Sequence, residues 1–312
     1  MRRLDFISFL FVPFLAASIA AAAAIAGPER AGASGPALLG TYRELADQLA
    51  HNPYGQPLHL VAEETDRRVT GDAYAVLRHP FAEAARPLSD ATQRCEILLL
   101  PFNTKHCEAA TDSPDRLALT IFIGRKYTTP LERTHRLDFR FDVAERRDDY
   151  LRVVLTAPDG PFGTRDYRIV LELVPVGESR AFLHFGYSYV YGKLAHAAMQ
   201  AYLSTIGANK VGFTTEGADA EGRPALVRGM RGVMERNTMR YYLAIEAYLT
   251  ALKASAAERP ARMIDAWFVA VERYPRQLHE LERGEYVAMK RQEFERMRKG
   301  VSPARQTASS SP

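Results

Sequence analysis

The chain has 312 residues, of which 47% are hydrophobic and 25% are charged. These proportions are ordinary for a folded protein and exclude fibrous, collagen-like and wholly disordered classes. The 41 Lys and Arg residues nearly balance the 37 Asp and Glu residues, which leaves a net charge of +4. Both signs are mixed along the chain, as in Ala144–Arg152. A basic track for nucleic acid would be more one-sided, so we expect no nucleic-acid binding.

The N-terminus has the layout of a secretory signal peptide. Arg2 and Arg3 precede an apolar run over residues 6–26, and small residues suited to cleavage lie at its end. We therefore expect residues 1–26 to direct export, most simply to the periplasm. The alternative is that residues 6–26 stay uncleaved and anchor the protein in the inner membrane, because about 20 apolar residues can span a bilayer.

Gly, Ala, Pro and Ser dominate residues 27–40, a composition that predicts a linker. The overlapping segment 37–55 carries apolar residues at helical spacing, and Gly55 and Pro57 end it. Residues 58–69 partly alternate between apolar and polar side chains, which is typical of a strand.

Prolines punctuate the next part of the chain. Residues 71–90 predict two short helices, interrupted at Pro80 and Pro87. Residues 91–100 are apolar and stop at Pro101, which predicts a buried strand or the end of a helix.

Cys95 and Cys107 are the only two cysteines. In an oxidising compartment two cysteines this close in sequence predict a disulfide, since a strand and a turn near Pro101 could bring them together. The competing interpretation is a metal site that also uses His106. The spacing is poor for zinc and no CxxC partner exists, so we expect a disulfide and no metal site.

The middle of the chain predicts an antiparallel sheet. Residues 135–149 alternate apolar and charged side chains, as expected for a strand with one face in water. Further strands are predicted over residues 116–126, 149–158, 164–176 and 179–192. Turn residues separate them and no helix interrupts, which is the pattern of an antiparallel meander.

Helices dominate the last part of the chain. Residues 193–207 and 228–255 each carry an apolar stripe at helical spacing. One or two more helices follow Pro260, and residues 301–312 form a polar tail that we expect to be disordered. The charges within residues 230–242 allow two interpretations, a solvated helix face or a surface that docks on a membrane or a partner.

Two stretches resemble the START-like superfamily (SRPBCC, or helix-grip), which includes lipid-transfer domains and polyketide cyclase-like proteins. GDAYAVLRHPFAEAARPLSDATQRCEILL is similar to the family's first helix pair and second strand. GTRDYRIVLELVPV and RAFLHFGYSYVYG, followed by AHAAMQAYLSTIGANKVGF, are similar to its last two strands and long helix. The resemblance covers about residues 58–215.

The resemblance implies an α+β fold in which a curved antiparallel β-sheet wraps around a long α-helix, here residues 193–207, with a cavity between them. It also implies a ligand-binding domain over residues 41–220. Residues 225–300 lie outside the resemblance and would form a C-terminal helical extension.

The implied cavity gives a set of candidate ligand-binding residues. Tyrosines on one strand face could offer rings and hydroxyls to a ligand, or could be ordinary packing. Arg165 could pair with a ligand carboxylate or phosphate, or with Asp166 or Asp159 at the surface. The candidates are Phe139, Phe141, Arg165, Phe185, Tyr187, Tyr189, Ala198 and Tyr202.

No sequence motif of nucleophilic, phosphate-binding or metal-dependent catalysis is present, and we expect no catalytic residue, cofactor or metal. The leading hypothesis is noncatalytic binding of a lipid or other apolar small molecule, with the C-terminal helices gating the pocket or contacting a membrane surface. A second is a cyclase- or hydratase-type enzyme that pairs His184 with an acid in the cavity. A third is a protein-interaction module with a filled core.

Overall fold

The computed structural model describes residues 33–65, 67–113, 116–193, 196–197, 199, 205, 209–218 and 221–300. The expected signal peptide and C-terminal tail lie outside these residues, as does most of the expected helix at 193–207. None of the described helices is long and apolar enough to cross a membrane.

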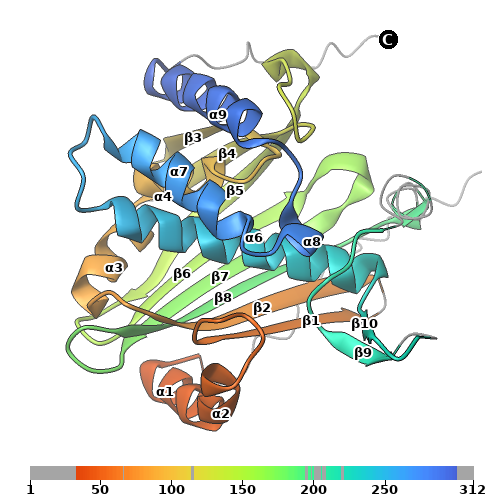
Figure 1. Cartoon of the computed structure of the whole chain (residues 1–312). Helices are drawn as coiled ribbons and strands as arrows, with labels where there is room; N and C mark the ends of the chain where they lie inside the picture. Colours follow the sequence, from red (N-terminus) through yellow and green to blue (C-terminus); the bar gives the residue numbers. More distant parts are fainter. Residues whose placement is uncertain are drawn as a thin grey trace, which may run out of the picture. The chain divides into compact units, whose positions relative to one another are not determined.

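Eight antiparallel strands form one curved sheet in the order β1-β2-β8-β7-β6-β5-β4-β3 (Figure 1). The six strands from β3 to β8 follow one another as a meander, and β8 then pairs with β2, which places β1 and β3 at the two edges. The strands are β1 Leu58–Thr65, β2 Arg68–Leu77, β3 Thr104–Ser113, β4 Arg116–Ile123, β5 His135–Arg146, β6 Leu151–Asp159, β7 Arg165–Pro175 and β8 Ala181–Val190.

The alternation in sequence becomes two faces of the sheet. Along β5, Leu137, Phe139 and Phe141 are buried while the residues between them are exposed, as the period of two requires. The buried set faces the main core, and we call this the inner face. A second, two-stranded sheet consists of β9 Thr215–Ala218 and β10 Pro224–Leu226. Two 3-10 turns lie in connections between strands, η1 Leu131–Arg133 and η2 Pro161–Gly163.

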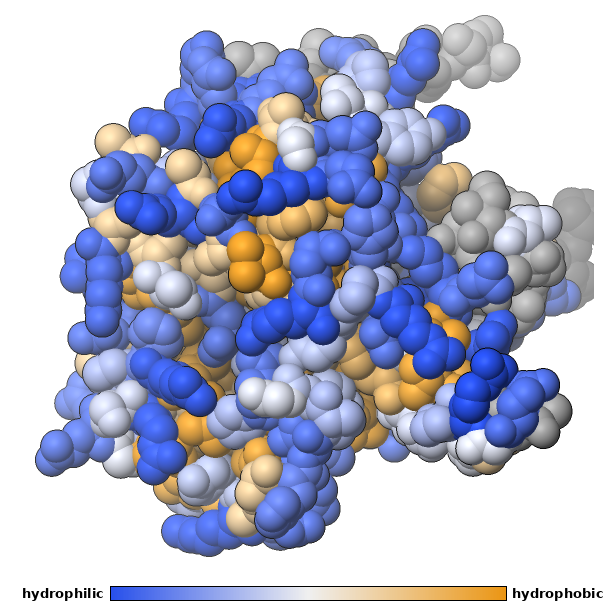
Figure 2. Space-filling model, viewed as in Figure 1, coloured by the Kyte–Doolittle hydropathy of each residue, from blue (hydrophilic) through white to orange (hydrophobic). Residues whose placement is uncertain are grey.

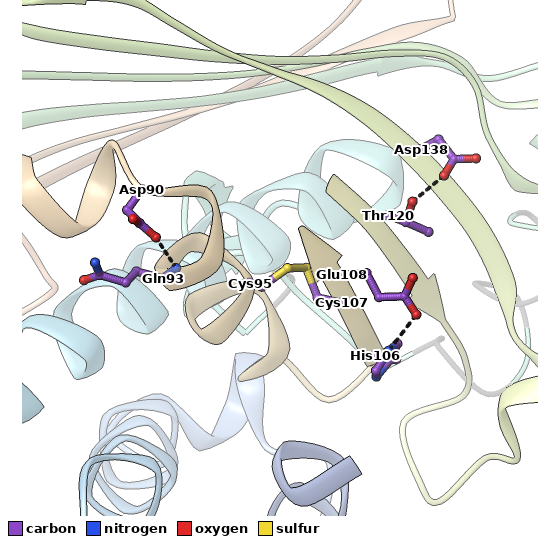
Figure 3. Close-up of a disulfide and its surroundings, with 8 residues drawn as sticks. All are labelled: Asp90, Gln93, Cys95, His106, Cys107, Glu108, Thr120 and Asp138. Atoms are coloured by element: carbon purple, nitrogen blue, oxygen red, sulfur yellow. Dashed lines mark hydrogen bonds and ion pairs between the residues drawn. A yellow bond between two sulfur atoms is a disulfide. The ribbon is translucent and has the colours of Figure 1, made fainter. Parts of the chain in front are cut away.

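Helices α3 (Phe81–Leu88) and α4 (Ala91–Leu99) connect β2 to β3. Residues 91–100, for which we had left a strand or a helix end open, form a helix. Asp90 caps it by accepting a hydrogen bond from the Gln93 amide at 2.8 Å. The predicted disulfide is confirmed, because Cys95 of α4 is bonded to Cys107 of β3 (Figure 3). Both thiols are used in this bond, which removes the metal interpretation.

The long helix on the inner face is α6 (Gly229–Ala251), which packs on β1, β2 and β8. We had expected residues 193–207 to supply this helix, and most of them lie outside the described residues. Gly71 of β2 makes the close approach possible. A Cβ added there would lie 2.7 Å from Cγ of Met234 and closer still to the Thr238 hydroxyl. Strand β2 therefore carries no side chain at the point where Met234 and Thr238 of the helix approach it.

The helices after residue 225 are part of the same compact unit as the sheet, which runs from Ser34 onward. Helix α6 packs against α7 (Arg259–Val271), α8 (Pro275–Leu278) follows, and α9 (Arg283–Arg298) packs on α7 and β3. Lys290 of α9 donates hydrogen bonds to the carbonyls of Pro101 and Thr104, each at 2.8 Å. The predicted extension thus supplies the long helix and much of the core.

The charged segment 230–242 is largely buried, contrary to both interpretations of it as a surface. Glu235 accepts hydrogen bonds from the amide and the hydroxyl of Thr214, at 3.0 and 2.6 Å. Arg236 donates to the Val211 carbonyl at 3.1 Å. These buried charges hold the segment 211–214 on α6, which composition alone could not indicate.

Part of the outer face, on β1, β7 and β8, is covered by α1 (Gly35–Glu44) and α2 (Ala46–Ala50). Helix α1 begins inside the expected linker, because Ser34 caps it and accepts a hydrogen bond from the Ala37 amide at 3.3 Å. A second apolar cluster lies under these helices and includes Leu38, Leu49, Tyr74, Val76, Tyr150, Val174 and Phe182.

Candidate functional site

Aromatic side chains gather on the inner face where β7 and β8 meet α6. Strand β8 presents Phe185, Tyr187 and Tyr189 on this face, since alternate residues of a strand share one side. Strand β7 adds Tyr167, and α6 adds Tyr241. With Phe139 of β5 these six residues are called the ring cluster.

The rings of this cluster contact one another continuously. The ring centroids of Tyr167 and Tyr189 are 5.2 Å apart and those of Tyr187 and Tyr189 are 5.7 Å apart. Tyr241 bridges from the helix, at 6.0 Å from Phe185 and 5.9 Å from Tyr187. These distances are typical of favourable aromatic pairs. The cluster therefore joins the sheet to α6 through ring surfaces.

The hydroxyls of Tyr187 and Tyr189 differ from that of Tyr167. The Tyr167 hydroxyl donates a hydrogen bond to the Thr164 hydroxyl at 2.7 Å. For the hydroxyls of Tyr187 and Tyr189, the described part of the chain offers no hydrogen-bond partner. Burial raises the pKa of both phenols, and neighbouring tyrosines raise it further. Both groups therefore stay neutral and can donate a hydrogen bond to a guest.

Four of the predicted site residues come together in the ring cluster, namely Phe139, Phe185, Tyr187 and Tyr189. Phe141 is buried on the same face of β5, opposite Leu117 and Leu155 of the neighbouring strands. Ala198 and Tyr202 lie outside the described residues.

Arg165 does not join the ring cluster. It is exposed and its guanidinium lies 3.6 Å from the Asp166 carboxylate, which is the surface ion pair that we had left open. The register of β7 shifts between Arg165 and Arg168, and Asp166 there has a φ of 53°. This bulge breaks the alternation that would have brought Arg165 to the inner face.

Sequence reasoning missed two members of the cluster. Tyr167 could have been found, because it shares the inner face of β7 with the buried Ile169 and Leu171. Tyr241 could not, since its helix had been assigned to a separate extension. A search of the sequence for aromatic residues on α6 would have had no reason to connect them with β8.

His184 lies on the opposite face of β8 from the ring cluster. Its Nδ1 is 2.8 Å from Glu172 of β7 and its Nε2 is 2.7 Å from Asp72 of β2. The Tyr150 hydroxyl donates to the same Glu172 at 2.6 Å, and Tyr74 stacks on the imidazole. The predicted pairing of His184 with an acid thus exists, but on the outer face and not beside the aromatic residues.

Two pockets open among the described residues of the C-terminal helices. One of about 350 Å³ lies between α7 and α9. Another of about 380 Å³ lies between α9 and the connection after β4, beside Tyr127 and Met289. Apolar surface on the side that carries these helices is broken up by hydrophilic side chains (Figure 2). In the described residues no group of three His, Cys, Asp or Glu side chains could hold a metal ion.

Known proteins give a likeness of fold only. No family model matches the chain, and no curated protein matches its sequence. Human StAR-related lipid transfer protein 5 is 9% identical, with a TM-score of 0.33, over 55% of this chain and 89% of its own. The Zhui aromatase/cyclase from Streptomyces sp. R1128 is 10% identical, with a TM-score of 0.32, over 69% and 99%. Norcoclaurine synthase from Thalictrum flavum is 13% identical, with a TM-score of 0.32, over 48% and 82%.

The architecture itself decides the fold. A curved antiparallel sheet holds a helix pair between its second and third strands, and a long helix crosses its inner face after the last strand. This is an α+β fold of the helix-grip type. The predicted fold class is therefore confirmed, although α6 takes the place given to residues 193–207.

Proposed function

We propose that the protein binds a lipid or another apolar small molecule on the ring cluster, between the sheet and α6, without catalysis. The observation that carries this proposal is the pair of hydroxyls on Tyr187 and Tyr189, which are neutral and have no described partner within an aromatic surface. Apolar surface buried by a guest yields about 25 cal/mol per Å² before the costs of binding. The hydroxyls would orient the guest.

The enzyme alternative receives less support. A cyclase or hydratase needs an acid or a base within reach of its substrate. His184 faces the outer side, and the ring cluster itself consists of phenyl and phenol groups. Phenols whose pKa is raised above the usual value are poor proton-transfer groups near neutral pH. A filled-core interaction module remains the other outcome that the experiment below separates.

Native mass spectrometry of the protein purified from its own envelope, followed by solvent extraction, tests the proposal. We expect a stoichiometric apolar molecule. Exchanging Tyr187→Phe together with Tyr189→Phe keeps the rings and removes the hydroxyls, so affinity for a guest with a polar head should fall about tenfold or less. Tyr42→Phe, a tyrosine that packs on Phe182 of the outer face, is the matched control. If the protein stays free of guest after incubation with membrane lipids, the proposal is wrong and the filled-core interpretation is favoured.

We also propose that the protein is exported to the periplasm. The signal-like N-terminus and the disulfide between Cys95 and Cys107 support this, because disulfides persist in oxidising compartments. Cell fractionation combined with an intact mass tests it. A mature chain that begins near residue 27 is expected, whereas a full-length chain in the membrane fraction would favour the anchor alternative.

A further inference from the structure

The pocket of about 350 Å³ between α7 and α9 has no part in the proposed function. The two helices pack on each other (Figure 1), and the ring of Tyr286 on α9 stacks on Trp267 and Phe268 of α7, with centroids 5.1 and 5.5 Å apart. Two apolar side chains line the pocket, the buried Ile264 of α7 and the half-buried Val287 of α9. Small-molecule sites typically have volumes of about 300–1,000 Å³, so this pocket has room for a small guest. We call it the α7–α9 pocket.

Gly284 of α9 keeps part of the α7–α9 pocket open. It lies in the first turn of the helix and its φ is not positive, so the backbone there does not require glycine. No atom lies within 4 Å of a Cβ added at this position, so close packing does not require glycine either. Glycine also weakens a helix relative to alanine. The missing side chain therefore leaves space that neither the backbone nor the packing of the protein uses.

The charged residues that line the α7–α9 pocket are two arginines and one aspartate, a net charge of +1. Arg283 of α9 donates a hydrogen bond to Asp265 of α7, and these two charges offset each other. Arg291, further along α9, has no ion-pair or hydrogen-bond partner among the described residues. Glu295, the acid one turn after Arg291, pairs instead with Lys299 at 2.7 Å. Arg291 is therefore available to an anion that enters the pocket.

We propose that the α7–α9 pocket binds a small apolar molecule that bears a carboxylate, at a site separate from the ring cluster. Arg291 would hold the carboxylate through charge-assisted hydrogen bonds, because a planar guanidinium can pair with both oxygens. The apolar body would lie against Ile264 and Val287, in the space beside Gly284. An exposed ion pair gains little free energy in water, so burial of the apolar body supplies much of the affinity.

NMR titration of the full-length protein with three ligands of equal chain length tests this inference: hexanoate, hexanol and hexylammonium. The wild type should bind hexanoate about fivefold more tightly than hexanol, and hexylammonium more weakly than either. In Arg291→Gln, affinity for hexanoate should fall to that for hexanol, which itself stays unchanged. Arg276→Gln, which removes an exposed arginine of α8 outside the pocket, is the matched control.

Two further variants change the pocket in opposite directions. Gly284→Leu fills the open space, so affinity for hexanoate and hexanol alike should fall about tenfold, with no decrease in the melting temperature. Asp265→Asn removes the ion pair of Arg283, so affinity for hexanoate should rise about threefold while affinity for hexanol does not change.

Three results overturn the inference. Binding that is the same in the wild type, Arg291→Gln and Gly284→Leu would place the guest elsewhere on the protein. A wild type that binds hexanoate and hexanol equally would show that no cation selects the carboxylate. A wild type that binds neither would show that the pocket takes no such guest. The proposed function is tested separately, by the molecule that co-purifies with the protein, and stands or falls independently of these results.

Discussion

At the scale of single residues, the outer face is organised around His184. Its imidazole links β2, β7 and β8, because the carboxylates of Glu172 and Asp72 hydrogen-bond to its two nitrogens. Burial alone would lower the pKa of His184, but the two carboxylates raise it by more. The charged imidazolium is therefore favoured, and it separates two acids that would otherwise face each other.

The pH dependence of stability should report this arrangement. The pKa of His184 in the folded state lies above its ordinary value of 6.5. The stabilisation that His184 gives to the folded state is therefore fully present below pH 6.5. This stabilisation is lost as the pH rises through the raised pKa. In His184→Gln this decline should disappear, and the free energy of unfolding at pH 6 should fall by roughly 3–5 kcal/mol, the usual cost of breaking a buried pair.

Urea unfolding at a series of pH values between about 6 and 9 measures both effects. His51→Gln is the control, because that side chain, just after α2, is 79% exposed. An unchanged pH dependence in the His184 variant would show that another group is responsible.

At the scale of elements, the packing of α6 on the sheet depends on the absence of a side chain at Gly71. Gly71→Ala would push a methyl group into Met234 and Thr238. We expect the free energy of unfolding to fall by about 1–3 kcal/mol, as for other overpacked sites.

Adding Thr238→Ala removes the hydroxyl that lies nearest to the new methyl group, so it should recover part of this loss. Gly40→Ala on α1 is the control, since no atom lies within 4 Å of the added carbon. It should be neutral or slightly stabilising. Denaturant titration of five proteins, the wild type, the three single variants at Gly71, Thr238 and Gly40, and the double variant, measures the differences. An additive double variant would contradict the proposed clash.

Strands β4 to β8 and the helix over residues 228–255 were predicted from sequence. Two features were not: residues 71–77, predicted as helix, belong to strand β2, and the helix over 228–255 was not placed on the inner face of the sheet. Strands such as β5 show their two faces through strict alternation, which local patterning records. Helix α6 instead buries Glu235, Arg236 and Arg240, whose partners come from residues 211–214 and from Glu280. Pairings between distant parts of the chain leave no local pattern, so these charges looked like a solvated face. Four of the six members of the ring cluster were predicted, from β5 and β8, while Tyr241 was missed because the position of α6 was not predicted.

At the scale of the whole unit from Ser34 onward, the disulfide joins the helix pair to an edge strand. Cys95→Ser with Cys107→Ser should lower the free energy of unfolding by about 3 kcal/mol, because the disulfide restricts the unfolded chain by closing a loop of this length. Thermal unfolding with and without a reductant measures this. Reduction should destabilise the wild type and leave the double variant unchanged, and an equal response of both would contradict the prediction.

Helix α9 has a consequence for the order in which the molecule is made. It is the last described helix, and its Lys290 binds carbonyls of the turn that leads into β3, an edge strand. A ribosome delivers this helix only after the sheet has emerged. Until then the β3 edge is open to pairing with other chains. Delaying folding until synthesis is complete, with a chaperone holding the nascent chain, would protect that edge from aggregation.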